Sequence, residues 1–183
     1  MDVIEKINPI NDASEKKAYY EITEKLSSFY YKYIFKNNSY FKIMPPDIFF
    51  DEFIKNDFNT IYVPHEFENI SKQYFIIKNM NHQISPVLYN VGTYYYDDPK
   101  NKVNGQFDVV TMSKDGYNFY EVKFTNSPID DNIVNEEISQ LKNLKINYNK
   151  LGFISKKGFD IKNKNDYDLI SINDLYNLKK VAN

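Results

Sequence analysis

Residues 106–124 of the chain read QFDVVTMSKDGYNFYEVKF, where two runs rich in Val, Phe, Tyr and Thr flank Asp115-Gly116. Asp-Gly between two such runs is among the strongest short-range signals of a β-hairpin. We therefore predict two antiparallel strands. The first strand carries Asp108, and the second carries Glu121 and Lys123.

The register of this hairpin decides which side chains meet, because opposed residues and residues two apart on one strand share a face. A two-residue loop would place Asp108 opposite Lys123, and a four-residue loop would place it opposite Glu121. Either loop gathers all three charged side chains on one face. A three-residue loop would place Asp108 opposite Val122 and break the group.

Two carboxylates beside an ammonium group are typical of a site for a hard cation. Mg²⁺ and Mn²⁺ prefer oxygen ligands and are often held by one or two carboxylates plus substrate phosphate oxygens. A neighbouring lysine can orient water and offset charge on the phosphate. The alternative is a cross-strand salt bridge on a solvated face, worth at most about 1 kcal/mol. Asp97 and Asp98 form a rival pair, but their place before Pro99 is more typical of a turn.

Composition limits the class of protein. The 183 residues suffice for about one domain, and 42% hydrophobic and 17% aromatic content indicate a globular chain. The chain has no cysteine, which excludes disulfides and zinc-thiolate sites. It has no apolar run long enough to span a membrane and no apolar signal core near its start, so we expect a soluble, cytoplasmic protein without membrane contact.

The charge pattern bears on nucleic-acid binding. A net charge of −2 argues against indiscriminate binding. Between Lys142 and Lys164, lysines greatly outnumber acids, so this stretch is either a phosphate-tracking face or, more commonly, a solvated surface. The chain contains no arginine, the usual bidentate reader of guanine, so we expect no sequence-specific base readout by this domain alone.

Apolar periodicity predicts the elements around the hairpin. Before it we expect a loose leading segment over residues 1–13, helices over 13–36, 47–55 and 64–80, a strand over 87–96 and a loop over 97–105. After it we expect a helix from Asp130 or Asp131 to about Tyr148, strands over 151–155 and 168–172, and a short helix over 173–178. His65 and His82 have no partner at metal-ligand spacing and are expected at the surface or at helix ends.

Two of these helices offer polar side chains to the hairpin. Glu68 lies on the shoulder of the apolar stripe of the helix over 64–80, where it could reach a site over the sheet or face water. In the helix that follows the hairpin, Gln140 lies roughly 90° from the centre of the apolar stripe, and Glu137 lies nearer to that stripe.

Asp108, followed thirteen positions later by Glu121-Val122-Lys123, resembles the Asp…(Asp/Glu)-x-Lys signature of the PD-(D/E)XK nuclease superfamily. The expected order of helix, three-stranded antiparallel meander, helix and strand is the core of that restriction-endonuclease-like fold. The resemblance implies an α/β protein with this core, preceded by a small helical segment.

Over roughly residues 15–180 the chain is also similar to the nuclease-like C-terminal domain of a family of prokaryotic AAA ATPases. The stretches that carry the similarity are Tyr20-Glu21-Ile22-Thr23, Phe29-Tyr30-Tyr31, Phe67-Glu68, Gly105 to Val110, Glu121 to Phe124 and Glu136 to Leu141. No P-loop occurs, so the ATPase module is missing. We expect an N-terminal helical segment over residues 1–60, packed on an α/β core over residues 61–183, in one structural domain.

The resemblance implies a metal-dependent nuclease, a hydrolase acting on phosphodiester bonds, with DNA as the first candidate substrate. Asp108, Glu121 and Glu68 would hold Mg²⁺ or Mn²⁺, Lys123 would position water, and Gln140 would fix Lys123 or a phosphate. Where family members often have an acid two residues before the aspartate, this chain has Gln106, which removes one possible extra ligand.

Two alternatives stay open. The chain could be a non-catalytic module that docks DNA or a partner protein while retaining the nuclease fold, or a stand-alone, toxin-like nuclease of a defence system. The expected partners are nucleic acid, an AAA ATPase or a defence-system protein, and a second copy of the chain in a homodimer.

Overall fold

The hairpin lies in the middle of a five-stranded sheet in the computed structural model, which describes residues 3–12, 16–98 and 102–177. The strand order is β3-β4-β5-β7-β9. Strands β3 to β5 form an antiparallel meander, and β7 and β9 run parallel to β5. Their bounds are Leu88–Asp98 (β3), Val103–Ser113 (β4), Gly116–Lys123 (β5), Lys150–Ser155 (β7) and Asp168–Ser171 (β9). The chain is thus a mixed α/β protein, as predicted.

The hairpin has the register of the four-residue loop, with one further pair, Ser113–Gly116, that leaves only Lys114-Asp115 in the turn. Gly116 has a φ of 111°, which glycine adopts without the steric cost of a Cβ. The last described pair on β4 is Val109–Tyr120. One more step of this register brings Asp108 opposite Glu121.

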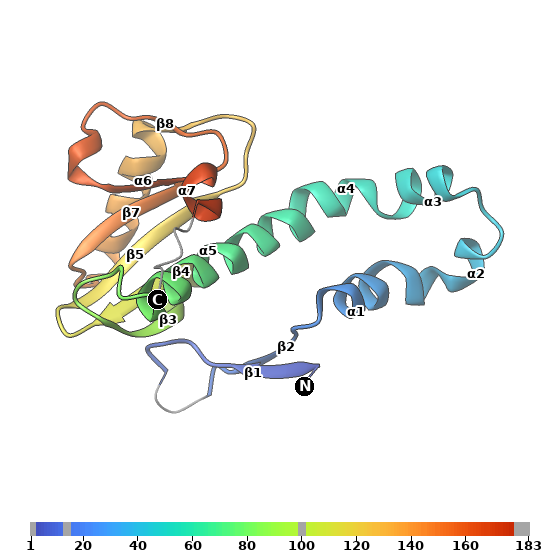
Figure 1. Ribbon diagram of the computed structural model, residues 1–183, viewed down its shortest axis with the longest axis horizontal. Coiled ribbons are helices and arrows are strands. Elements are labelled where there is room, and N and C mark those ends of the chain that lie inside the picture. Colours follow the sequence, from blue (N-terminus) through green and yellow to red (C-terminus); the bar gives the residue numbers. More distant parts are fainter. Residues whose placement is uncertain (1–2, 13–15, 99–101, 178–183) are drawn as a thin grey trace.

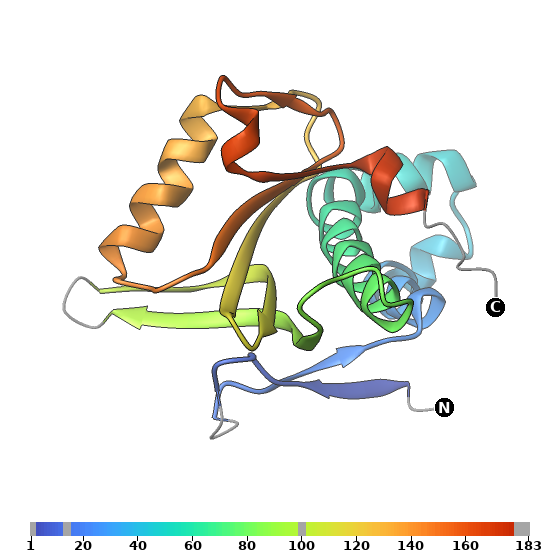
Figure 2. The same cartoon turned by 60° about the vertical axis from the view of Figure 1, so that its left-hand side comes forward.

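Two helices cover the two faces of the sheet (Figure 2). α5 (Val63–Met80) packs Phe67, Tyr74 and Phe75 against Val109 and Tyr120. α6 (Asp131–Asn143) packs on the other face, in a second core formed with residues of β4, β5 and β7. Along the chain the order is therefore α5, the three-stranded meander, α6 and β7, as the sequence predicted.

The ends of α6 explain its length. The Asp130 carboxylate accepts hydrogen bonds from the backbone N–H groups of Asn132 and Ile133, each at 3.1 Å, and so caps the first turn. The helix was expected to reach Tyr148. It ends at Asn143, and Lys145 has a left-handed φ of 54°, a conformation that stops an α-helix.

An arm of helical segments extends away from the sheet and leads into α5 (Figure 1). Its core is separate from those of the sheet and contains Tyr33, Phe49 and Ile54. The segments of the arm are α1 (Lys25–Phe29), a π-helical turn at Tyr30–Ile34, a 3₁₀ turn at Phe35–Asn37, α2 (Asn38–Phe41), α3 (Pro46–Phe53), α4 (Lys55–Asp57) and a second π-helical turn at Phe58–Tyr62. The helix predicted over 47–55 corresponds to α3 and the start of α4.

The N-terminal prediction was wrong in two places. Residues expected to be loose include β1 (Ile4–Ile7), and the start of the helix expected over 13–36 is instead β2 (Tyr19–Ile22), which pairs antiparallel with β1. Tyr19 and Ile22 are spaced for a helical stripe, but pairing with a distant segment decides the outcome. The Ile10 N–H donates to the Thr93 carbonyl at 2.7 Å and joins this segment to β3. Residues 1–2 and 13–15 lie outside the described residues.

Smaller differences occur at the ends of the meander and of the chain. The predicted loop over 97–105 is shorter, because β3 extends to Asp98 and β4 starts at Val103; residues 99–101 are outside the described residues. Short strands β6 (Ile129–Asp130) and β8 (Phe159–Asp160) pair parallel, a 3₁₀ turn spans Lys164–Asp166, and α7 (Ile172–Tyr176) follows β9. Among the described residues, no helix has the length and apolar character needed to cross a membrane.

Candidate functional site

Asp108 lies at a β-bulge in the strand that carries it. Between the pairs Gly92–Val110 and Tyr94–Phe107, β4 contains two residues, Asp108 and Val109, where β3 contains only Thr93. A bulge of this kind bends a strand and re-aims its side chains, and bulges are enriched next to active sites. The local backbone therefore sets the direction of the Asp108 side chain, in addition to the alternation predicted from sequence.

The Asp108 carboxylate is partly buried among charged groups. It accepts a hydrogen bond from Gln106 Nε2 at 2.8 Å. Burial raises the pKa of Asp108 above its ordinary value, and the negative charge of Glu68 raises it further, whereas Gln106, Lys72 and His65 act in the opposite direction. The net effect disfavours the charged form of the carboxylate.

Glu121 and Lys123, two residues apart on β5, form an ion pair between Lys123 Nζ and Glu121 Oε1. Val122 between them packs on the α5 side of the sheet, so by alternation this pair points to the other face. Burial raises the pKa of Glu121, the neighbouring lysine lowers it, and the charges of Asp108 and Glu68 raise it again. The charges of Asp108, Glu68 and Lys123 therefore all act on Glu121. We call these four residues the carboxylate cluster.

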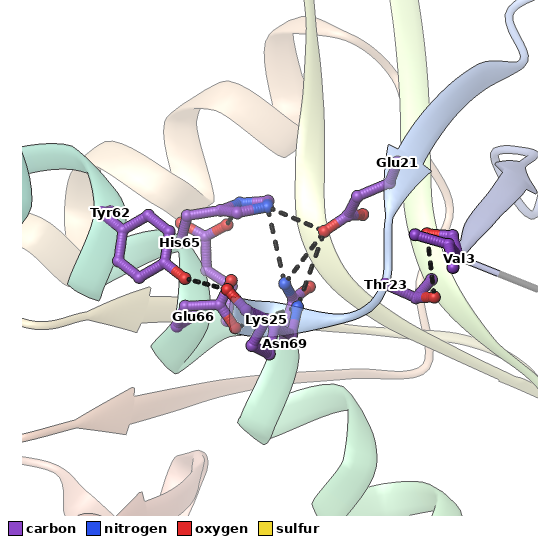
Figure 3. Close-up of polar contacts among 9 residues, drawn as sticks. Val3, Glu21, Thr23, Lys25, Tyr62, His65, Glu66 and Asn69 are labelled. Carbon is purple, nitrogen blue, oxygen red and sulfur yellow. Dashed lines mark hydrogen bonds and ion pairs between the residues drawn. The ribbon is translucent and has the colours of Figure 1, made fainter. Parts of the chain in front are cut away.

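His65 links Glu68 to the N-terminal hairpin, which is formed by β1 and β2; Figure 3 shows the contact of His65 with Glu21 on β2. His65 Nδ1 lies 3.4 Å from Glu68 Oε2, and His65 Nε2 lies 3.3 Å from Glu21 Oε1 on β2. Asn69 Nδ2 donates to the same Glu21 oxygen at 3.3 Å. His65 does lie in the first turn of a helix, as expected, but it is partly buried and bridges two carboxylates.

A fourth carboxylate of the cluster comes from α6. Burial raises the pKa of Glu137 to about 7, and the charge of Glu121 contributes to the increase. The charge of Glu137 in turn raises the pKa of Lys123, against the lowering effect of burial. Sequence reasoning did not assign Glu137 to the site, although its place nearer the apolar stripe than Gln140 was a usable signal.

Gln140 has a different neighbour from the one expected. Its Nε2 donates to Tyr96 Oη at 3.0 Å, and so the structure does not bring it to Lys123. The side chain lies instead in a groove between α6 and the adjoining ends of β3 and β4.

The other predicted candidates lie apart from this cluster. Asp97 and Asp98 belong to β3 rather than to a turn. His82 follows α5 with a left-handed φ of 55°. Most lysines between Lys142 and Lys164 are solvent-exposed. Over residues 3–12, 16–98 and 102–177, no three His, Asp or Glu side chains are placed closely enough to hold a metal ion as they stand.

Comparison with known proteins identifies a family. A family model described as archaeal and bacterial proteins of unknown function matches residues 30–140, which include the helical arm, α5, the meander and most of α6. No curated protein and no solved structure matches the chain.

Proposed function

The chain belongs to the DUF234 family of archaeal and bacterial proteins of unknown function, and from the residues of its candidate site we propose that it hydrolyses phosphodiester bonds of nucleic acid, with DNA as the first candidate. The observation that carries the proposal is that Asp108 acts on Glu121, because the charge of Asp108 raises the pKa of Glu121. They come from adjacent strands and are both partly buried, and burial raises both pKa values. Such perturbed carboxylates are typical of functional sites.

The residues fit a divalent cation of the Mg²⁺ or Mn²⁺ type. The donors are oxygens, and such ions are commonly held by one or two protein carboxylates, with water and substrate phosphate completing the shell. Asp108 and Glu121 would hold the ion, with Glu68 as the third candidate, because its charge raises the pKa of both residues. A bound cation would supply positive charge that polarises the phosphate.

The chain's own side chains have distinct tasks in this proposal. The Lys123 ammonium, now paired with Glu121, would move toward a phosphate oxygen and offset the charge that develops there. Glu137, with a pKa of about 7, can hold or release a proton near neutral pH. Glu68 is oriented by His65 and acts from the α5 side.

The arrangement of elements supports the resemblance to the PD-(D/E)XK nucleases. The order along the chain is α5, the β3–β5 meander, α6 and β7, which is the order of that core. Asp108 lies on β4, and Glu121 and Lys123 lie on β5. An AAA ATPase or defence-system partner, a homodimer and a cytoplasmic location remain proposals from sequence.

The proposal is tested first by metal binding. Calorimetric titration of the protein with Mn²⁺ should show one saturable site whose affinity falls at least about tenfold in Asp108→Asn. Asp51→Asn, which changes an exposed carboxylate of the helical arm, is the matched control and should leave binding unchanged. Equal Mn²⁺ affinity in Asp108→Asn and the wild type would overturn the assignment.

Cleavage is tested separately. Lys123→Ala should abolish Mg²⁺-dependent cleavage of DNA while retaining Mn²⁺ binding, because the lysine acts on the phosphate and not on the metal. Cleavage that survives in both Asp108→Ala and Lys123→Ala would refute a nuclease role for this site.

A second candidate is a non-catalytic module that docks DNA or a protein. The observation that favours it is the Lys123–Glu121 ion pair, which already compensates one carboxylate within the chain. In that case Mn²⁺ would find no saturable site in the wild type.

A further inference from the structure

A groove lies beside the candidate site, between α6 and the adjoining ends of β3 and β4, with a volume of about 990 Å³. Its apolar lining comes from Tyr96, Val103 and Leu144, and most of its polar lining is neutral amide and hydroxyl. This volume is at the upper end of the range of small-molecule pockets.

Two contacts and a neighbouring glycine position the Tyr96 side chain in this groove. Its ring packs against Phe107 with centroids 5.3 Å apart, and its hydroxyl accepts the hydrogen bond from Gln140. Gly105 leaves room for it, since a Cβ there would lie 2.6 Å from the Tyr96 hydroxyl oxygen. The groove therefore presents an aromatic side chain that is already positioned before any ligand binds.

The amides facing the groove are available for a ligand. Asn135 and Asn143 lie on the exposed side of α6, and neither side chain has a hydrogen-bond partner within the described part of the chain. An asparagine amide both donates and accepts, so it can match the edge of a nucleobase.

The charges of the groove select against phosphate. Among its described lining residues, the only charged side chains are those of Asp98 and Glu136, and both are acidic. The groove therefore favours a flat, neutral, polar group over an anionic one. Gly105, which lies against Tyr96 of the groove, is followed directly by Gln106, which donates to Asp108 of the carboxylate cluster. The groove therefore adjoins the cluster, and the charge of Glu136 acts on Lys123 accordingly.

We propose that this groove binds an unpaired nucleobase of a single-stranded nucleic acid whose backbone passes the carboxylate cluster. The choice of a nucleobase rests on the proposed function, because the neighbouring site is the one proposed to act on a phosphodiester. Stacking on an aromatic side chain is a common means of holding single-stranded bases, and it tolerates different sequences. The asparagine amides can add hydrogen bonds to the edge of the base. The substrate class is thus single-stranded nucleic acid, or a duplex with an unpaired end.

The test is binding without cleavage. Fluorescence anisotropy in EDTA would compare a labelled single-stranded DNA oligomer, the same oligomer with abasic central nucleotides, and its duplex. We expect the wild type to bind the base-bearing single strand about tenfold more tightly than either of the others. The double variant Asn135→Ala/Asn143→Ala should lose this preference.

The control is Asn56→Ala, an exposed asparagine in the helical arm, which should keep the preference. Equal affinity for base-bearing and abasic strands in the wild type, or an undiminished preference in the double variant, would overturn the groove proposal. Mn²⁺ titration of the same proteins separates the two proposals. The double variant should bind Mn²⁺ as the wild type does. If the wild type preferred base-bearing strands but did not bind Mn²⁺, the metal site would be refuted and the groove proposal would stand.

Discussion

At the scale of single residues, Glu137 has the clearest consequence for stability. Burial and the charge of Glu121 raise its pKa from the ordinary value of 4.5 to about 7 in the folded protein. Between these values the folded protein binds more protons than the unfolded chain. The free energy of unfolding must therefore decrease as pH rises through this window.

Glu137→Gln removes this ionisation while keeping the shape of the side chain. In EDTA, we expect the variant to be more stable than the wild type at about pH 8 and closest to it at about pH 5. Thermal unfolding followed by circular dichroism across this range measures the difference. The difference should widen with pH, and a constant offset between the two proteins would contradict the assignment.

The register of the hairpin that carries the candidate site could be predicted from local sequence, whereas contacts between distant segments could not. Asp108, Glu121 and Lys123 follow from strand alternation and hairpin register, which are local properties. The apolar stripe of α6 placed Glu137 nearer to the core than Gln140, but periodicity does not show which side chains of the sheet each of them meets. The role of His65 was missed because its partner Glu21 is distant in sequence and lies on a strand that was predicted as a helix.

At the scale of elements, β7 is packed tightly between its neighbouring strands at Gly152. A Cβ there would lie 2.6 Å from Tyr120 Cδ1 and 2.7 Å from the Asp168 carbonyl oxygen. The carbonyl belongs to the backbone of β9, which pairs with Gly152 itself. Neither neighbour can move without disturbing the core.

Gly152→Ala should accordingly destabilise the protein by about 1–3 kcal/mol, the usual cost of overpacking. Gly105→Ala is the matched comparison, because its Cβ would meet only the far end of the Tyr96 side chain. Urea unfolding should show a clearly smaller loss for Gly105→Ala. The reverse order would contradict this account of the packing of β7 between β5 and β9.

The accuracy of the element predictions depended on how local each signal was. The β3–β5 meander, α5 and β7 follow from turn residues and apolar spacing within each segment. β1 and β2 did not, because each is only four residues long and is stabilised by pairing across the intervening residues. The early end of α6 depends on a left-handed backbone at Lys145, which a lysine does not signal.

At the scale of the whole molecule, the N-terminal hairpin is joined to the sheet and to α5 by a small number of polar contacts. Asn11 Nδ2 donates to the Tyr95 carbonyl at 2.7 Å, and Asn11 Oδ1 accepts from the Tyr95 N–H at 2.9 Å. On the α5 side the contacts converge on Glu21, through His65 and Asn69 (Figure 3). The hairpin should therefore be the part of the fold whose attachment responds most to the charge of His65.

The last prediction concerns this attachment. The hydrogen bond between His65 and Glu68 raises the pKa of His65 above its ordinary value of 6.5, and Glu21 contributes to the increase. Burial opposes it. The charged form is therefore stabilised in the folded protein. This stabilisation is fully present below about pH 6.5 and is lost as pH rises through the folded pKa.

Hydrogen exchange, corrected for the intrinsic effect of pH, should show protection of β1 and β2 decreasing between about pH 6 and about pH 8. The amides of β4 and β5 in the core serve as an internal control and should not change in the same way. In His65→Gln, a neutral side chain that can still donate to Glu21, protection of the hairpin should be lower at acidic pH and independent of pH. If the wild type and His65→Gln showed the same pH profile, the His65 ion pairs would not be what holds the hairpin to α5.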